Sequence, residues 1–102
     1  MSKDDAKKIV ERYAEKLKGN KIPLLGLYLF GSFAKGESRK WSDIDVAIFS
    51  TREETDEFII ELGRLTREVD LRIEPHIFSE NDLKTISTPF VEEILRTGIK
   101  VA

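Results

Sequence analysis

The feature that most constrains the fold of this chain is a pair of strand-like segments separated by a short polar stretch. Residues 24–30 form a nearly continuous apolar run, which is typical of a central strand buried on both faces. Residues 42–49 alternate between polar and apolar positions, which predicts a second strand with two different faces. The intervening residues 31–40 are small and polar and predict a loop or a short helical turn. The fold is therefore expected to be built on a sheet.

Helices are predicted on either side of these two strands. Residues 3–18 place apolar side chains on one stripe at helical spacing. The members of this stripe are Ile9, Val10, Tyr13, Ala14 and Leu17. A second helix is predicted over residues 53–67, and Thr51 and Glu54 are expected to open it as a capping box. Its side chains at core spacing are Phe58, Leu62 and Leu65.

A third strand is predicted over residues 69–78, where apolar and polar side chains alternate again. Val69, Leu71, Ile73 and Ile77 are expected to point inward, and Asp70, Arg72, Glu74 and His76 to share the opposite face. A polar turn at residues 79–82 follows, and then a helix over residues 88–96 with Pro89 near its first position. Residues 99–101 are expected to add a short edge strand.

This order of elements predicts an α/β or α+β fold in which helices pack on a small mixed sheet. The 102 residues are expected to form a single domain.

Two aspartates in the second strand are candidates for metal binding. Asp43 and Asp45 are two positions apart, so both side chains are expected to project from one face of the strand. Neighbouring carboxylates repel each other unless a proton or a cation lies between them, and carboxylate oxygens are the ligands that divalent cations prefer. The alternative is a solvent-exposed strand face, because short motifs of this kind also arise by chance. Aspartate is a poor strand former, which favours the metal site.

The first strand ends in Gly31-Ser32, which is a candidate phosphate-binding turn. Glycine lacks a Cβ atom, so phosphate oxygens can reach the backbone N–H groups, and the Ser32 hydroxyl can donate to the same anion. The alternative is an ordinary turn, in which both residue types are common. Lys35, Arg39 and Lys40 are available to neutralise phosphate charge and rank below the carboxylates.

Phosphoryl chemistry with two metal ions calls for a third carboxylate from a neighbouring strand. Residues 69–78 offer Asp70 and Glu74 on one face. Asp70 is the preferred candidate because its side chain is shorter and stiffer, and Glu74 is the alternative. His76 is expected to be a half-buried residue that a neighbour satisfies rather than a metal ligand.

Composition narrows the class of ligand. The formal net charge is −2, which predicts no strong binding to nucleic acids and makes metal ions the expected source of positive charge for a triphosphate. The chain has no cysteine, which excludes disulfides and thiolate metal sites. The first residues are charged and no segment has the length of a membrane span, so a cytoplasmic location is expected.

The stretch Gly31-Ser32-Phe33-Ala34-Lys35-Gly36, followed by Ser42-Asp43-Ile44-Asp45, resembles the signature of the DNA polymerase beta-like nucleotidyltransferase superfamily. The short chain is similar to the minimal branch of that superfamily. The resemblance implies the polymerase beta-like fold and the transfer of a nucleoside monophosphate, AMP from ATP, to an acceptor hydroxyl with release of pyrophosphate.

The resemblance also implies a role for each candidate residue. Gly31 and Ser32 would hold the triphosphate, with Lys35 nearby, and Asp43 and Asp45 would bind two Mg²⁺ ions. The third carboxylate of the family, which helps to activate the attacking hydroxyl, is matched by Asp70 in its Val-Asp-Leu context, with Glu74 kept as the alternative.

Minimal members of this superfamily resemble one half of a two-gene system, in which the partner is a small helical HEPN-type protein. The pair is often an antitoxin and a toxin, and adenylylation of the partner is one implied activity. Because 102 residues leave no room for an acceptor-holding domain, association with such a protein or with a second copy is expected. The alternative is an antitoxin-like binding subunit with weak or no catalysis.

Overall fold

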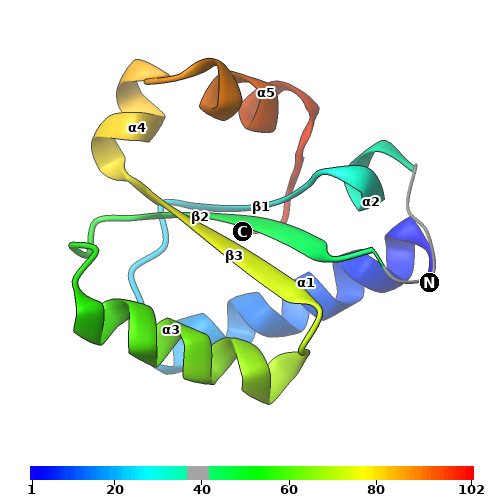
Figure 1. The fold of residues 1–102 in the computed structure, drawn as a ribbon, viewed down its shortest axis with the longest axis horizontal. Coiled ribbons are helices and arrows are strands. Elements are labelled where there is room, and N and C mark those ends of the chain that lie inside the picture. Colours follow the sequence, from blue (N-terminus) through cyan, green and yellow to red (C-terminus); the bar gives the residue numbers. More distant parts are fainter. Residues whose placement is uncertain (37–41) are drawn as a thin grey trace.

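A four-stranded mixed sheet separates two layers of helices in the computed structural model, which describes residues 1–36 and 42–102 (Figure 1). The strand order is β3-β2-β1-β4. β2 runs antiparallel to β1 and parallel to β3, and β1 also pairs antiparallel with β4. The strands are β1 (Gly26–Phe30), β2 (Ile44–Ser50), β3 (Ile73–Ser79) and β4 (Ile99–Lys100). The predicted fold class is confirmed.

Helices cover both faces of this sheet (Figure 1). They are α1 (Lys3–Gly19), α2 (Ser32–Lys35), α3 (Asp56–Val69), α4 (Glu80–Thr85) and α5 (Pro89–Thr97). The long helices α1 and α3 lie together on one face, and the short helices α4 and α5 lie on the other. Within the described residues, no helix combines the length and the apolar character that crossing a membrane requires.

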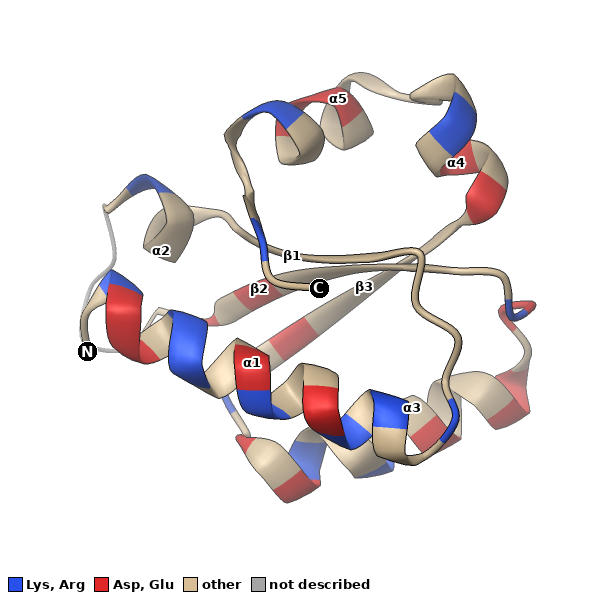
Figure 2. Cartoon of the chain, turned by 180° about the vertical axis from the view of Figure 1, so that it is seen from behind, with Lys and Arg blue, Asp and Glu red and all other residues tan. Residues whose placement is uncertain are grey.

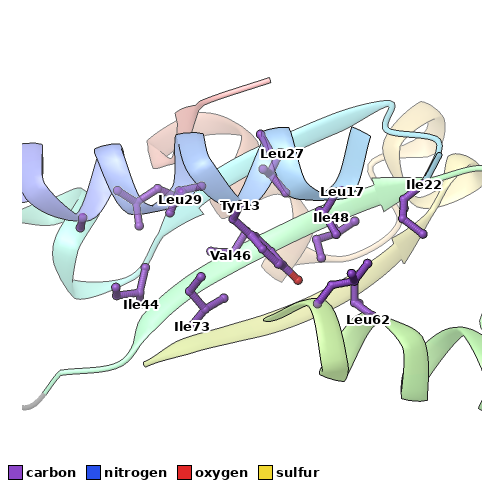
Figure 3. Packing of buried hydrophobic residues seen from close by; sticks show 14 of the residues in the cluster. Tyr13, Leu17, Ile22, Leu27, Leu29, Ile44, Val46, Ile48, Leu62 and Ile73 are labelled. Carbon is purple, nitrogen blue, oxygen red and sulfur yellow. The ribbon is translucent and has the colours of Figure 1, made fainter. Parts of the chain in front are cut away.

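The face covered by α1 and α3 carries the main apolar core (Figure 3). Its buried side chains include Val10, Tyr13, Leu17, Leu27, Leu29, Ile44, Val46, Ile48, Phe58, Leu62, Leu65 and Ile73. The Tyr13 hydroxyl lies 2.7 Å from Thr66 Oγ1, which itself donates to the carbonyl of Leu62 over 2.6 Å. Burial raises the pKa of Tyr13 to about 12. The apolar stripes predicted for α1 and α3 lie in this core and are confirmed.

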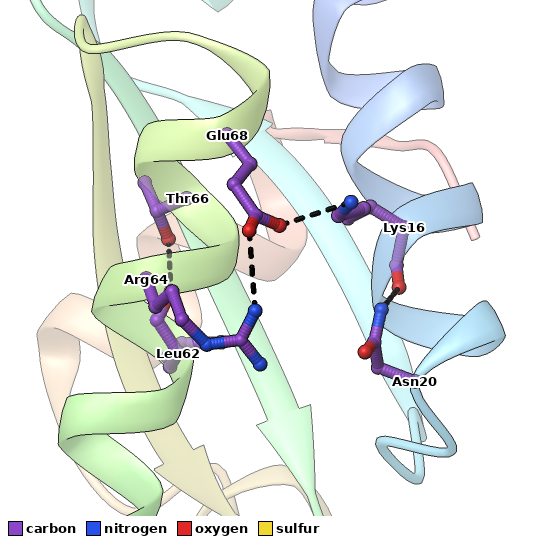
Figure 4. A network of polar contacts seen from close by, with 6 residues as sticks. All are labelled: Lys16, Asn20, Leu62, Arg64, Thr66 and Glu68. Atoms are coloured by element: carbon purple, nitrogen blue, oxygen red, sulfur yellow. Dashed lines mark hydrogen bonds and ion pairs between the residues drawn. The ribbon is translucent and has the colours of Figure 1, made fainter.

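Polar contacts at the rim of this core connect the two long helices (Figure 4). Lys16 Nζ lies 2.9 Å from Glu68 Oε2, and Arg64 Nη1 lies 3.2 Å from Glu68 Oε1. The Asn20 side chain donates to the carbonyl of Lys16 over 2.8 Å and so caps the end of α1. Exposed ion pairs of this kind contribute at most about 1 kcal/mol each, so the apolar core provides most of the stability.

The N-terminus of α3 differs from the prediction. The helix begins at Asp56, and Thr55 is its N-cap, accepting a hydrogen bond from the Phe58 amide over 3.2 Å. The predicted capping box of Thr51 and Glu54 is therefore wrong. Residues 79–82 also differ from the predicted turn, because Ser79 ends β3 as the N-cap of the short helix α4, which begins at Glu80.

The largest difference concerns the start of the third strand. α3 continues to Val69, and β3 begins at Ile73, so residues 69–72 are not part of a strand. Leu71, predicted to point inward, is 81% exposed. The second strand also begins later than predicted, at Ile44, whose amide donates to the carbonyl of Arg72 over 2.8 Å. The last turn of a helix followed by a tight turn produced the same alternation of side chains as a strand.

Candidate metal and nucleotide site

Two carboxylates meet on the face of the sheet that α4 and α5 cover. In the sheet register, Asp45 of β2 lies opposite Glu74 of β3 on one side and opposite Phe30 of β1 on the other. Residues paired in this way project from the same face of the sheet. The acidic bands on β2 and β3 are visible side by side in Figure 2. The geometry therefore brings Asp45 together with Glu74, which was the alternative to Asp70.

His76 completes this cluster of Asp45, Glu74 and His76. One ligand atom from each of the three residues lies within 4.8 Å of the others, and His76 Nε2 is 3.5 Å from Asp45 Oδ1. Nε2 is buried and has no hydrogen-bond partner among the described residues, since 3.5 Å is beyond the usual length of such a bond. His76 is half-buried, as predicted, and has the Asp45 carboxylate as a neighbour, but Nε2 makes no hydrogen bond within the described residues.

Gly31 lies directly against this cluster. Its φ of +75° is in the left-handed region, and a Cβ atom at this position would collide with Asp45 Oδ2. Two independent constraints thus require glycine where β1 passes into α2. The Gly31-Ser32 turn and the carboxylate of Asp45 form one continuous site, with Ser32 as the first residue of the helical turn.

The electrostatics of Asp45 favour a bound cation. Burial raises the pKa of Asp45, the interaction with His76 lowers it, and the charge of nearby Asp43 raises it again. Asp43 itself is exposed and lies just before β2. A carboxylate whose charged form is disfavoured by burial and by a like charge gains most when a cation approaches.

Lys35 and Gly31 both line a cavity of about 150 Å³ between β1 and α5. Phe30, Gly31, Lys35, Phe90 and Glu93 are among its lining residues. The Lys35 ammonium lies 3.0 Å from Glu93 Oε1, so it is paired with an acid of α5. Neither α5 nor Glu93 was predicted near the site, because the pair spans 58 positions in the sequence. Arg39 and Lys40 lie outside the described residues.

Asp70 occupies a different place from the one predicted. It is the C-cap of α3, and its carboxylate accepts hydrogen bonds from the Arg72 amide over 2.9 Å and from the Arg72 guanidinium over 2.8 and 3.0 Å. These bonds lower the pKa of Asp70. It is not a member of the cluster of Asp45, Glu74 and His76. Since β3 starts only at Ile73, Glu74 takes the position beside Asp45 that Asp70 was expected to hold.

The residues present fit a divalent cation. Two carboxylates and one imidazole converge, and a buried nitrogen faces them with no partner of its own among the described residues. Carboxylate oxygen and imidazole nitrogen are both common ligands of divalent metals. Asp43 adds a further carboxylate within electrostatic range of Asp45.

Comparison with known proteins shows the family to which the chain belongs. Residues 11–102 match the family model described as polymerase beta, nucleotidyltransferase. A protein of Methanocaldococcus jannaschii that carries the provisional name protein adenylyltransferase is 35% identical over 77 residues, which cover 72% of this chain and 74% of the relative.

Solved structures share the fold. A toxin–antitoxin structure with AMP-PNP matches with a TM-score of 0.65 and 26% identity, over 90% of this chain and 72% of that chain. A protein of Sulfolobus solfataricus, provisionally described as a nucleotidyltransferase, matches with a TM-score of 0.66 and 16% identity, over 96% and 80%. A mutant of the toxin–antitoxin pair MntA-HpeT matches with a TM-score of 0.62 and 19% identity, over 89% and 70%.

Proposed function

We propose that this chain transfers AMP from ATP to a hydroxyl group of a partner protein. The chain belongs to the polymerase beta nucleotidyltransferase family and is therefore a nucleotidyltransferase. The observation that carries this proposal is the contact of the Gly31 turn with Asp45, which itself lies opposite Glu74. A phosphate-binding turn and paired carboxylates in one site suit a metal-bound triphosphate. The M. jannaschii relative named as a protein adenylyltransferase supports AMP as the transferred group.

The metal ligands in this proposal are Asp43, Asp45 and Glu74, and the ions are two Mg²⁺ or similar divalent cations. Ions bound there would neutralise charge on the phosphates during transfer. Asp45 is the central ligand because it contacts both the turn and the β3 side chains. Asp43, exposed just before β2, is accessible from solvent to a metal that arrives with the nucleotide.

The chain's own groups then have separate tasks. The backbone N–H groups at Gly31 and Ser32 bind the β- and γ-phosphates, and Lys35 adds positive charge beside them. Glu74 orients the acceptor hydroxyl and takes its proton as the acceptor oxygen bonds to the α-phosphorus. The bond between the α-phosphorus and the bridging oxygen breaks in the same step, and pyrophosphate leaves. Glu74 replaces Asp70 in this role because the sheet register places it beside Asp45.

A partner protein is proposed as the acceptor because two similar structures are toxin–antitoxin assemblies. A small helical HEPN-type protein is the partner proposed for this chain. The same similarity favours a second candidate function, in which the chain is an antitoxin-like subunit that neutralises its partner by binding alone.

The test combines the chain with ATP labelled at the α-phosphate, Mg²⁺ and the protein encoded beside it. We expect label on that protein and release of pyrophosphate, both abolished by Asp45→Asn. Glu74→Gln should abolish transfer, and the matched control Asp70→Asn should retain it. Loss of transfer only in Asp70→Asn would overturn the assignment of Glu74. Binding and neutralisation of the partner without any transfer would support the second function instead.

A further inference from the structure

We infer that His76 is a direct ligand of the divalent cation at Asp45 and Glu74, and that it makes the site prefer Mn²⁺ to Mg²⁺ more strongly than a site of carboxylates alone. This inference rests on the metal site of the proposed function. It is independent of which nucleotide or acceptor the protein uses.

The position of His76 in the sheet directs its ring toward the cluster. His76 follows Glu74 by two residues on β3, so both side chains project from one face of the sheet. Its partner in the sheet register is the fully buried Ala47, whose methyl group leaves space beside Asp45 for an imidazole ring. Nε2 reaches to 3.5 Å from Asp45 Oδ1, close to the separation of two atoms that share one metal ion.

Two aromatic rings hold the imidazole in this position. The ring centroids of His76 and Phe30 are 5.1 Å apart at an interplanar angle of 67°, and those of His76 and Phe90 are 6.2 Å apart at 81°. Both contacts are edge-to-face, which is the favourable arrangement for aromatic pairs. The nitrogen that faces Asp45 is thus presented by a ring whose sides are packed.

The burial of Nε2 argues against a role in packing alone. A buried polar atom that makes no hydrogen bond destabilises the fold, and within the described residues Nε2 makes none, its approach to Asp45 Oδ1 being 3.5 Å. A phenylalanine would make the same contacts with Phe30 and Phe90 without that cost. A metal ion bound between Nε2 and the two carboxylates would satisfy the nitrogen, the Asp45 charge and the Glu74 charge together.

An imidazole ligand changes which metal the site prefers. Mg²⁺ is bound mainly by oxygen ligands and retains several waters, whereas transition metals accept imidazole nitrogen readily. Among the divalent ions that serve phosphoryl chemistry, Mn²⁺ combines tolerance of carboxylates with acceptance of nitrogen. His76 should therefore strengthen binding of Mn²⁺ and contribute little to binding of Mg²⁺.

The test loads the full chain with Mn²⁺ in the absence of nucleotide and measures electron spin echo modulation from ¹⁴N. We expect modulation from one coordinated imidazole, which must come from His76 because it is the chain's single histidine. In His76→Phe the modulation should disappear, and the Mn²⁺ affinity should fall by about tenfold or more. The Mg²⁺ affinity should change by less than about threefold. Phe90→Leu is the control, since it trims a ring contact and should keep the modulation.

The possible outcomes separate this inference from the proposed function. Mn²⁺ that binds in an Asp45-dependent manner without ¹⁴N modulation would overturn the role of His76 and leave the metal site intact. Mn²⁺ binding that Asp45→Asn does not weaken would overturn the metal site itself. Equal losses of Mn²⁺ and Mg²⁺ affinity in His76→Phe would show that the ring only positions Asp45, which also overturns direct ligation.

Discussion

The two faces of the sheet use the same strands for different purposes. Toward α1 and α3, the strands present Leu27, Leu29, Ile44, Val46 and Ile48, and all of these are fully buried. Toward α4 and α5, the alternate positions of the same strands carry polar groups among aromatic rings. Asp45 and His76 are partly buried there, and Glu74 is exposed. The apolar face toward α1 and α3 therefore provides the stability that allows the face toward α4 and α5 to hold Asp45, whose charged form is disfavoured by burial.

The helices that cover the two faces of the sheet differ in length. α1 and α3 have 17 and 14 residues and cover their face with continuous apolar stripes. α4 and α5 have 6 and 9 residues, and Phe90 of α5 is 45% exposed. The thinner layer leaves the cavity beside Gly31 open to a ligand. Substitutions on the two faces should therefore have opposite consequences for stability and function.

The largest effect is expected for the double substitution Asp43→Asn with Asp45→Asn. These residues belong to the site face, by which we mean the face of the sheet that carries Asp45, Glu74 and His76. Without these carboxylates, binding of Mg²⁺-ATP should be lost in a calorimetric titration, while the fold remains. Unchanged affinity would refute the metal site and, with it, the functional role of this face.

The same variant should make the metal-free protein more stable at neutral pH. The pKa of Asp45 is raised in the folded state, chiefly by burial, so its stabilising contribution is present below the unfolded pKa and is lost as the pH rises through the folded pKa. Asparagine avoids that loss. The gain in melting temperature should be present at pH 7 and shrink as the pH falls toward the unfolded pKa of aspartate, about 3.9. A gain that persists at low pH would show that charge is not its cause.

The next largest effect is expected on the opposite face, at Leu62. This side chain is 1% exposed in the core between α3 and the sheet, and Leu62→Ala should lower the free energy of unfolding by about 2–5 kcal/mol. Urea denaturation measures the loss, and the nucleotide affinity of the folded protein should not change. Ile60→Ala, on the same helix but 70% exposed, is the matched control and should have almost no effect. A change in nucleotide affinity in Leu62→Ala would mean that the two faces are coupled.

The features that depend on short stretches of sequence could be predicted. The Gly31 turn and Asp45 are connected by a single strand pairing, and the periodicity of α1 and α3 identified the core. The partner of Asp45 could not be predicted, because the register of the parallel strands β2 and β3 is set by how α3 packs and where it ends. Residues 69–72 fit both a strand and a helix end, which led to the choice of Asp70 over Glu74.

A smaller effect is expected for Gly31→Ala, which tests whether the turn belongs to the site face. Gly31, at φ +75° and ψ −150°, lies in a backbone region almost restricted to glycine, which costs an alanine about 1–3 kcal/mol, and its Cβ would collide with Asp45. The rise in melting temperature on adding Mg²⁺-ATP should therefore be strongly reduced. Gly36→Ala is the control for a positive φ alone, because Gly36 lies in the left-handed α region at φ +73° and ψ 19° and has no atom within 4 Å of an added Cβ. Equal nucleotide-dependent stabilisation in the two variants would mean that the Gly31 turn is structural and does not bind the nucleotide.

The smallest effect is expected for Asp70→Asn, because Asp70 is not a member of the cluster of Asp45, Glu74 and His76. The carboxylate is bound to Arg72, whose side chain is 45% exposed, so the loss of stability should be at most about 1 kcal/mol. The pKa of Asp70 is lowered in the folded state, so its contribution is present above the unfolded pKa and is lost as the pH falls through the folded pKa. The difference from the parent in urea denaturation should therefore be present at pH 7 and diminish below about pH 4. Transfer activity should remain, whereas Glu74→Gln should remove it with little change in stability. An Asp70→Asn variant that is stable but inactive would place the third carboxylate at the end of α3 and break the division between the two faces.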